Sequence, residues 1–262
     1  MRIAVAHKWA ADPQEAVVTA SGQVDQSRAR PSLSEYDAVA IALARGLADA
    51  VGAELVGLSV GGPEAASPLA TKTALARGLD SVLVLADQAL ASADSTTTAR
   101  ALAAAVTELG DVAVVLTGDC SVDRGARMTP AVLGGLLGWV TLTEVSAVSL
   151  DQTSLTVERE LEHGRQTLVL SAPAVLAVAA GAVEAPAPGM RDVLAAARKP
   201  VRQLALDQFD GDWGPLGQVV DRALAPTPDR RGIVIGTTDP TAAAAELIAH
   251  LSRDGLTWAG RP

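Results

Sequence analysis

The sequence predicts an α/β protein in which helices form layers on both faces of a mainly parallel sheet, with an antiparallel hairpin and an extended C-terminal arm. Three observations predict this three-layer fold. Short apolar segments alternate with helical segments through most of residues 1–140, which is the pattern of right-handed βαβ units. Residues 112–116 are wholly apolar, as expected for a strand that is buried on both faces. Hydrophobic residues make up 49% of the 262 residues but aromatic residues only 2%, so the core is built from small aliphatic side chains.

The first third of the chain begins this alternation. Residues 2–6 predict a strand, and the polar stretch 10–33, which contains Pro, Gly and Ser, predicts a loop. Ser34 is then expected to cap a helix, with Asp37 reaching back in a capping-box arrangement. Apolar residues recur at every fourth position along this helix, and Gly52 ends it.

The remaining elements continue in order. Up to residue 148 we expect strands at 54–60, 81–85, 112–116 and 141–148, and helices at 64–77 with Gly78 as C-cap, 94–109, and 130–137 with Thr129 as N-cap. Residues 155–170 predict a hairpin that turns at His163–Gly164 and leads into an apolar strand broken by Pro173. Further on we expect a broken loop and short helix over 182–200, an arm over 206–232, a strand at 233–235 and an amphipathic helix at 241–253. The predicted organisation is therefore an α/β domain over 1–200 and a C-terminal arm and helix over 201–262.

Charge and cysteine content restrict the classes of function. The net charge of −9 argues against non-specific binding to nucleic acid or anionic lipid. The single cysteine, Cys120, allows no intrachain disulfide, and the three histidines show no zinc-site spacing, so we expect no metal site. No segment resembles a signal peptide or is long enough to span a membrane, which predicts a cytoplasmic protein without direct membrane insertion.

Ligands of open α/β sheets bind beyond the carboxyl ends of the strands, and the richest loop at such a position is residues 117–129. Its small residues allow a ligand to approach the backbone, and the helix that starts at Pro130 favours an anion such as a phosphate. Arg124 and Arg127 add positive charge. An ordinary strand-to-helix connection with solvated charges is the other interpretation of this loop. Neither a Walker motif nor GxGxxG is present, and no catalytic constellation emerges, so we expect no bond chemistry of the chain's own.

Several segments, in the correct order, resemble one family. The residues of Val157–Ala177 resemble the signature of the electron-transfer flavoprotein beta subunit, with a departure at His163. Ala74–Asp80 resembles the Ala-Leu-Ala-Met-Gly-Ala-Asp motif of that family, and Ser59–Gly62 resembles its Val-Gly-Pro turn. Residues 190–201 resemble its partner-recognition loop. The likeness covers roughly residues 1–201.

The resemblance implies a Rossmann-like fold of the adenine-nucleotide-hydrolase type and a heterodimer with an alpha subunit. It implies an FAD held mainly by the alpha subunit and an AMP, or a second FAD in its place, held by this chain. Electrons would arrive from dehydrogenases and leave to a downstream oxidoreductase. The cofactor contacts implied by the resemblance are Ala6, Ser34, Glu35, Tyr36, Asp37, Val60, Gly61, Asp123, Arg124, Gly125, Ala126, Arg127, Met128 and Thr129. The implied partner-recognition residues are Met190, Arg198 and Lys199, and residues 201–262 would contact the alpha subunit.

Two other functions remain open at this point. One is a stand-alone regulatory domain that binds an adenine nucleotide, similar to a stress protein. The other is an enzyme that hydrolyses or transfers an adenylate group. A long C-terminal arm over residues 182–262 favours a subunit that wraps a partner, and an adenylate-transferring enzyme is expected to carry an SGG-type motif, which the sequence lacks.

Overall fold

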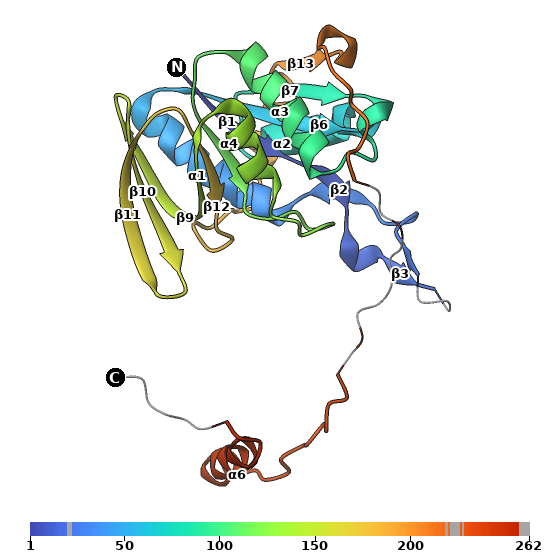
Figure 1. The fold of residues 1–262 in the computed structure, drawn as a ribbon, viewed down its shortest axis with the longest axis vertical. Coiled ribbons are helices and arrows are strands. Elements are labelled where there is room, and N and C mark those ends of the chain that lie inside the picture. Colours follow the sequence, from blue (N-terminus) through green and yellow to red (C-terminus); the bar gives the residue numbers. More distant parts are fainter. Residues whose placement is uncertain (20–22, 218–219, 221–225, 227, 257–262) are drawn as a thin grey trace. The chain divides into compact units, whose positions relative to one another are not determined.

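The computed structural model describes residues 1–19, 23–217, 220, 226 and 228–256. The chain forms two compact units, Met1–Ala223 and Leu224–Pro262. The first unit is a nine-stranded sheet with helices on both faces, so the predicted fold class is confirmed (Figure 1). The second unit contains one described helix, α6 (Pro240–Arg253).

The nine-stranded sheet is parallel except at one end. Its strands are β1 (Arg2–His7), β6 (Glu54–Gly61), β7 (Ser81–Ala86), β8 (Val112–Gly118), β9 (Val140–Asp151), β10 (Ser154–Leu161), β11 (Gly164–Ser171), β12 (Ala174–Val178) and β13 (Val201–Leu204). Their order across the sheet is β11-β10-β9-β12-β8-β1-β6-β7-β13, and only β10 pairs antiparallel, with β9 and β11. From β1 the chain builds outward through β6 and β7, and it then returns to place β8 on the other side of β1. The boundary between β1 and β8 is therefore the switch point at which a ligand cavity is expected.

Helices cover the two faces of the sheet in separate groups. Helices α1 (Glu35–Val51), α2 (Pro68–Ala76) and α5 (Met190–Ala196) contribute to one core, and α3 (Ser95–Leu109) and α4 (Thr129–Leu137) to the other. Successive side chains of a strand point to opposite faces, so in β1 Ile3 and Val5 enter the first core while Ala4 and Ala6 enter the second. Full burial of a side chain of the size of Ile3 or Val5 is worth about 1.5–3 kcal/mol.

The expected loop over 10–33 contains regular structure. Strand β2 (Trp9–Ala11) pairs with β5 (Pro31–Leu33), and β3 (Val17–Val18) pairs with β4 (Val24–Asp25). A 3-10 turn, η1 (Pro13–Glu15), lies between β2 and β3 in the sequence. Strands of two or three residues carry no readable alternation of apolar and polar side chains, which is why the sequence predicted only a loop here.

Two predicted helix boundaries were wrong. The helix expected over 64–77 is broken at Ser67, which separates η2 (Pro63–Ala66) from α2 and accepts a hydrogen bond from the Ala70 N–H. Pro68 explains the break, because proline disfavours helical backbone in the preceding residue. The C-cap of α2 is Arg77, and Gly78 follows it with a φ of 113°.

Further corrections concern the second half of the chain. Helix α4 begins at Thr129, so its N-cap position is Met128, whose side chain makes no capping hydrogen bond. The hairpin turns at Glu162–His163, one residue earlier than predicted, because Gly164 already pairs with Leu161.

The last predicted strand, at 233–235, is absent in the described structure. These residues have no strand partner among the described residues, and Val234 is 88% exposed. An apolar triplet forms a strand only where a sheet edge is available to pair with it. The edge strand is instead β13 (Val201–Leu204), which pairs with β7 beyond the domain boundary expected at residue 200. Two 3-10 turns, η3 (Gln88–Leu90) and η4 (Leu206–Gln208), complete the described elements.

The capping box predicted at the start of α1 was also wrong. Ser34 occupies the N-cap position but makes no side-chain capping bond, and its buried Oγ has no hydrogen-bond partner among the described residues. Asp37 does not reach back to Ser34; its carboxylate accepts the backbone N–H of Lys8 at 2.7 Å. The carboxylate that could have capped the helix is therefore used to hold the end of β1.

The contact between α1 and the end of β8 leaves no room for a side chain at Gly118. A Cβ there would lie 2.6 Å from Asp37 Oδ1 and 3.0 Å from the carbonyl carbon of Tyr36. We expect Gly118→Ala to lower the free energy of unfolding by about 1–3 kcal/mol, because backbone must move. Urea denaturation of the purified chain measures this. Gly46→Ala is the control: Gly46 lies within α1, a Cβ there would have nothing within 4 Å, and the change should be neutral or slightly stabilising. Equal stability of the two variants would contradict the prediction.

Candidate functional site

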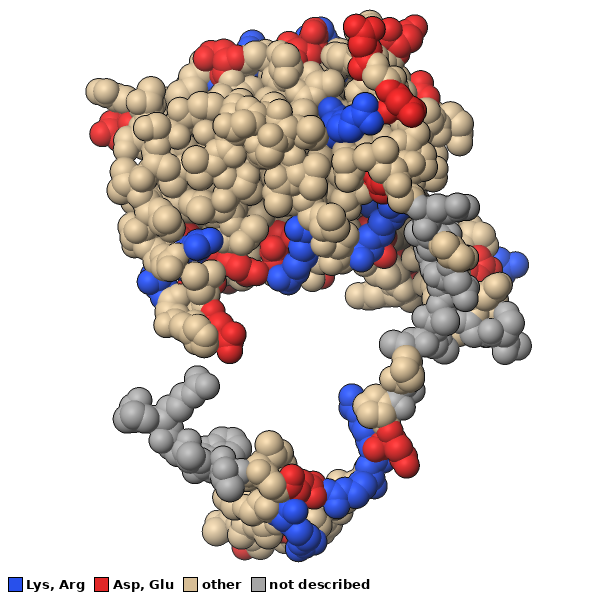
Figure 2. All heavy atoms as spheres, in the orientation of Figure 1, with Lys and Arg blue, Asp and Glu red and all other residues tan. Residues whose placement is uncertain are grey.

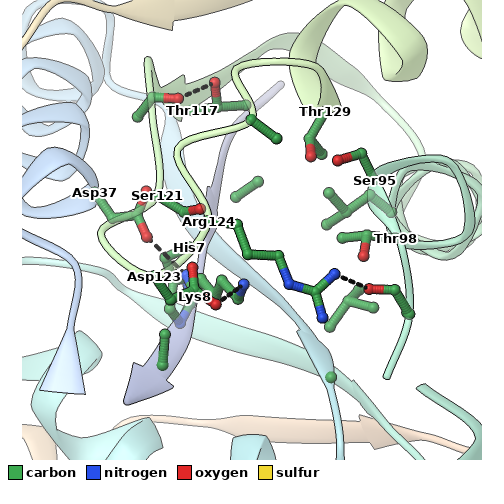
Figure 3. A pocket seen from close by; sticks show the side chains of 18 of the residues that line it. His7, Lys8, Asp37, Ser95, Thr98, Thr117, Ser121, Asp123, Arg124 and Thr129 are labelled. Carbon is green, nitrogen blue, oxygen red and sulfur yellow. Dashed lines mark hydrogen bonds and ion pairs between the residues drawn. The ribbon is translucent and has the colours of Figure 1, made fainter. Parts of the chain in front are cut away.

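A cavity of about 280 Å³ lies at the carboxyl ends of β1, β6 and β8, beside the switch point. The starts of α3 and α4 form its other wall (Figure 3). Most of the predicted cofactor contacts line it: Ala6, Asp37, Val60, Gly61, Asp123, Arg124, Ala126, Arg127, Met128 and Thr129. The fold therefore brings together residues from four separate segments of the sequence.

Four predicted contacts lie elsewhere. Glu35, Tyr36 and Gly125 line a second, more open hollow next to the cavity. Ser34 lines neither, since its side chain is buried beneath the start of α1. Helix geometry separates Glu35 and Tyr36 from Asp37, because residues at consecutive helical positions point in different directions.

Asp37 joins the ends of the two strands that flank the switch point. Its buried carboxylate accepts backbone N–H groups of Lys8, after β1, and of Gly118, at the end of β8. Burial raises the pKa of Asp37 to about 7, although both hydrogen bonds favour the ionised form. The neighbouring Lys8 ammonium lies 2.6 Å from Asp123 Oδ2. Burial opposes the charge of Asp123, but the hydrogen bond and charge of Lys8 outweigh it and hold its pKa below the usual range.

Arg127 is held at the rim of the cavity by two carboxylates. Its guanidinium lies 3.2 Å from Asp119 and 3.1 Å from Glu144. Arg127 and Glu144 both have positive φ, at 53° and 56°, a conformation that costs non-glycine residues of order 1 kcal/mol or more. Burial, together with the charge of Glu144, raises the pKa of Asp119, and Arg127 opposes this rise. Two strained residues therefore take part in the carboxylate–guanidinium cluster, and this cluster holds the loop between β8 and α4 in position.

The sequence was compared with models of known protein families. The model of the electron transfer flavoprotein domain matches residues 21–209, most of the chain. The chain belongs to the electron transfer flavoprotein domain family. Members of this family bind flavin and act as electron carriers, and the resemblance read from the sequence is confirmed at this level.

The cavity is also lined by residues outside the predicted set of cofactor contacts. His7 and Lys8 follow directly on the first predicted strand, and their position at its carboxyl end was the available signal. Burial lowers the pKa of His7 to about 4, so the imidazole is neutral at physiological pH. Ser95 and Thr98, in the first turn of α3, line the opposite wall. Their helix was predicted, but the packing of α3 on the sheet and against α4 brings that turn to the cavity.

The predicted partner-recognition residues lie at and beyond the short helix α5. Met190 is 76% exposed, and Arg198 is exposed as well. Lys199 is bound within the chain, because its ammonium donates to the carbonyl oxygens of Leu75 and Leu79 at 3.2 and 2.7 Å. These carbonyls lie at and after the end of α2, where a positive charge is favourable. The role of the three residues in partner recognition stays a prediction.

Two further findings concern metal binding and membrane insertion. The described residues contain no group of three or more His, Cys, Asp or Glu side chains placed to hold a metal ion. None of the described helices combines the length and the apolar character needed to cross a bilayer.

The raised pKa of Asp37 predicts a pH-dependent contribution to stability. Between the ordinary pKa of 3.8 and about 7 the folded chain keeps the Asp37 proton while the unfolded chain loses it. The contribution of Asp37 to stability therefore falls as the pH rises through this range, by up to about 1.4 kcal/mol per pH unit.

Urea denaturation of the wild type and of Asp37→Asn at pH 5, 6 and 8 measures this contribution. The stability difference, wild type minus variant, should decrease as the pH rises. The opposite contribution of His7, whose lowered pKa makes stability rise with pH from about 4 to 6.5, is common to both proteins and cancels. A difference that is constant with pH would show that Asp37 titrates normally.

Proposed function

We propose that this chain is the beta subunit of a heterodimeric electron transfer flavoprotein. It holds an AMP in the switch-point cavity, while an alpha subunit holds most of the FAD. The heterodimer accepts electrons from dehydrogenases and passes them to a downstream oxidoreductase. The observation that carries the proposal is the cavity itself, because it gathers most of the residues that the resemblance assigns to the nucleotide.

The size of the cavity supports AMP over a second FAD in this position. Ligand sites commonly measure about 300–1,000 Å³, and a cavity of about 280 Å³ lies at the small end of that range. FAD adds a second phosphoryl group, a ribityl chain and a three-ring flavin to the AMP moiety. A second FAD would therefore have to extend out of the cavity.

The half-buried Tyr36 supports a role beside the flavin of the alpha subunit. Its side chain lines the open hollow next to the cavity, together with Glu35 and Gly125. An aromatic ring at such a position packs against the edge of a flavin without taking part in bond chemistry. Electron transfer requires only close approach of the redox groups, so the chain needs no catalytic side chains.

Exposed apolar side chains support a partner subunit. Met128, Leu136 and Val140, in and next to α4, are about half exposed. Figure 2 shows that the face of the first unit turned to the viewer, on which α4 lies, is mostly uncharged, while acidic and basic side chains gather along its edges. Uncharged apolar surface of this kind is typical of an interaction site.

The second unit carries the same signal. Leu247 and Ile248 of α6 are 49% and 60% exposed, and none of the residues of this helix is buried. Among the described residues of the second unit, taken by itself, the apolar face of α6 is uncovered, and such an amphipathic helix is expected to bind a partner surface. We propose that residues 201–262 contact the alpha subunit, and that Met190 and Arg198 face partner dehydrogenases. The proposed location is the cytoplasm, where a lone thiol such as Cys120 stays reduced.

A stand-alone regulatory domain that binds an adenine nucleotide is the second candidate, since it needs the same cavity. It has no use for the uncovered apolar side chains of α4 and α6. Those side chains favour the subunit.

Co-expression with an alpha subunit from the same organism tests the proposal. We expect a stable heterodimer with a flavin absorption spectrum that releases one FAD and one AMP on denaturation. Release of two FAD and no AMP would retain the heterodimer but place a second flavin in the cavity. A colourless monomer that does not bind the alpha subunit would contradict the beta-subunit assignment.

A further inference from the structure

We propose that Arg124, Ser95 and Thr98 form an anion subsite on the α3 side of the cavity, which holds the phosphoryl group of the bound nucleotide. This inference rests on the proposed function for the identity of the nucleotide. Ser95 and Thr98 lie outside the set of contacts that the family resemblance implies. The subsite follows from which charges in the cavity are already neutralised.

Of the described residues that line the cavity, three carry cationic side chains, and two of these are paired. Lys8 forms an ion pair with Asp123, and Arg127 forms ion pairs with Asp119 and Glu144. Each pair places a carboxylate against the cation, so little net positive charge remains there for a ligand. The ion pairs of Lys8 and Arg127 hold the loops that line the cavity in position.

Arg124 is the cation that differs. Its guanidinium extends from the loop after β8 to the opposite wall, where it donates to the carbonyl oxygen of Ala93 at 2.8 Å (Figure 3). Within the described residues it forms no ion pair. A carbonyl fixes the direction of the guanidinium without cancelling its charge, and an arginine has five N–H donors. The remaining donors are available to an anion in the cavity.

Two hydroxyl groups lie on the same wall. Ser95 and Thr98 are three positions apart in the first turn of α3, so they share a face of the helix, and both line the cavity. Neither hydroxyl has a hydrogen-bond partner in the part of the chain that the structure describes. Figure 3 shows both on the side toward which Arg124 extends. A guanidinium and two free hydroxyls supply the donors that phosphate oxygens require.

The first turn of α3, which carries the two hydroxyls, is held by hydrogen bonds with residues 214 and 217. Asp94 caps α3 by accepting the Thr97 N–H at 2.8 Å, and its other oxygen accepts the Gly217 N–H at 2.8 Å. These neutral backbone donors fix the position of the Asp94 carboxylate without cancelling its negative charge. The Thr97 hydroxyl donates to the Gly214 carbonyl at 3.0 Å, which further fixes the first turn of α3. The subsite is therefore preorganised before the nucleotide binds.

Calorimetric titration of the full chain, freed of bound nucleotide, tests the subsite with AMP, adenosine and inorganic phosphate as probes. We expect AMP to bind more tightly than adenosine. Arg124→Gln should weaken AMP binding by about tenfold to a hundredfold, as for loss of a charged hydrogen bond, and leave adenosine binding unchanged. The double variant Ser95→Ala/Thr98→Val should weaken AMP binding as well, by a smaller factor. Arg165→Gln removes the same charge from the β10–β11 hairpin and is the control, with AMP binding unchanged.

The outcomes separate this inference from the proposed function. Equal AMP binding by Arg124→Gln and the wild type, or a larger loss in Arg127→Gln than in Arg124→Gln, would overturn the subsite and leave the nucleotide proposal standing. Arg124-dependent binding of inorganic phosphate without binding of AMP would support the subsite and contradict the nucleotide. Absence of binding by all three probes would overturn both. Thermal unfolding of each variant, expected to match the wild type within a few degrees, shows that the fold is kept.

Discussion

The arrangement of the site depends on one buried carboxylate at the switch point of the sheet. Asp37 accepts N–H groups from the ends of β1 and β8, the two strands from which the chain leaves in opposite directions. A buried carboxylate is costly unless such donors satisfy it, so the first turn of α1 must stay against both strand ends. Gly118 permits this approach because it presents no side chain. The positions of the loops that line the cavity follow from this contact.

Among the described residues, the cationic side chains around the cavity fall into two groups, those paired with carboxylates and one that is not. Lys8 and Arg127 are neutralised by carboxylates and hold loops, whereas Arg124 is directed by a neutral carbonyl and keeps its charge. A ligand competes poorly for a cation that is already paired, because it must replace a partner that costs no binding entropy. Three cations of similar appearance in the sequence therefore have different roles in the fold.

The wall of the cavity is connected to the segment that leads to the second unit. Residues after η4 lie along α3, where Arg100 donates to the Asp212 carbonyl and stacks over the Trp213 ring at 5.5 Å. The Asp94 carboxylate that caps α3 also holds Gly217. A subunit that binds a partner through its C-terminal arm would thereby have the attachment of that arm fastened next to its nucleotide.

The sequence by itself determined the α/β class, most helices, the strands of the parallel sheet other than β13, the hairpin and the loop that lines the cavity. These features depend on local periodicity and on glycine and proline positions, which act over a few residues. It also indicated the family. It did not determine the use of Asp37, the pairing of Arg127 with Glu144, or the choice of β13 rather than residues 233–235 as the edge strand. Only the tertiary structure decided these, and likewise brought Ser95 and Thr98 to face Arg124, because each depends on which segments distant in the chain become neighbours when the helices pack on the sheet.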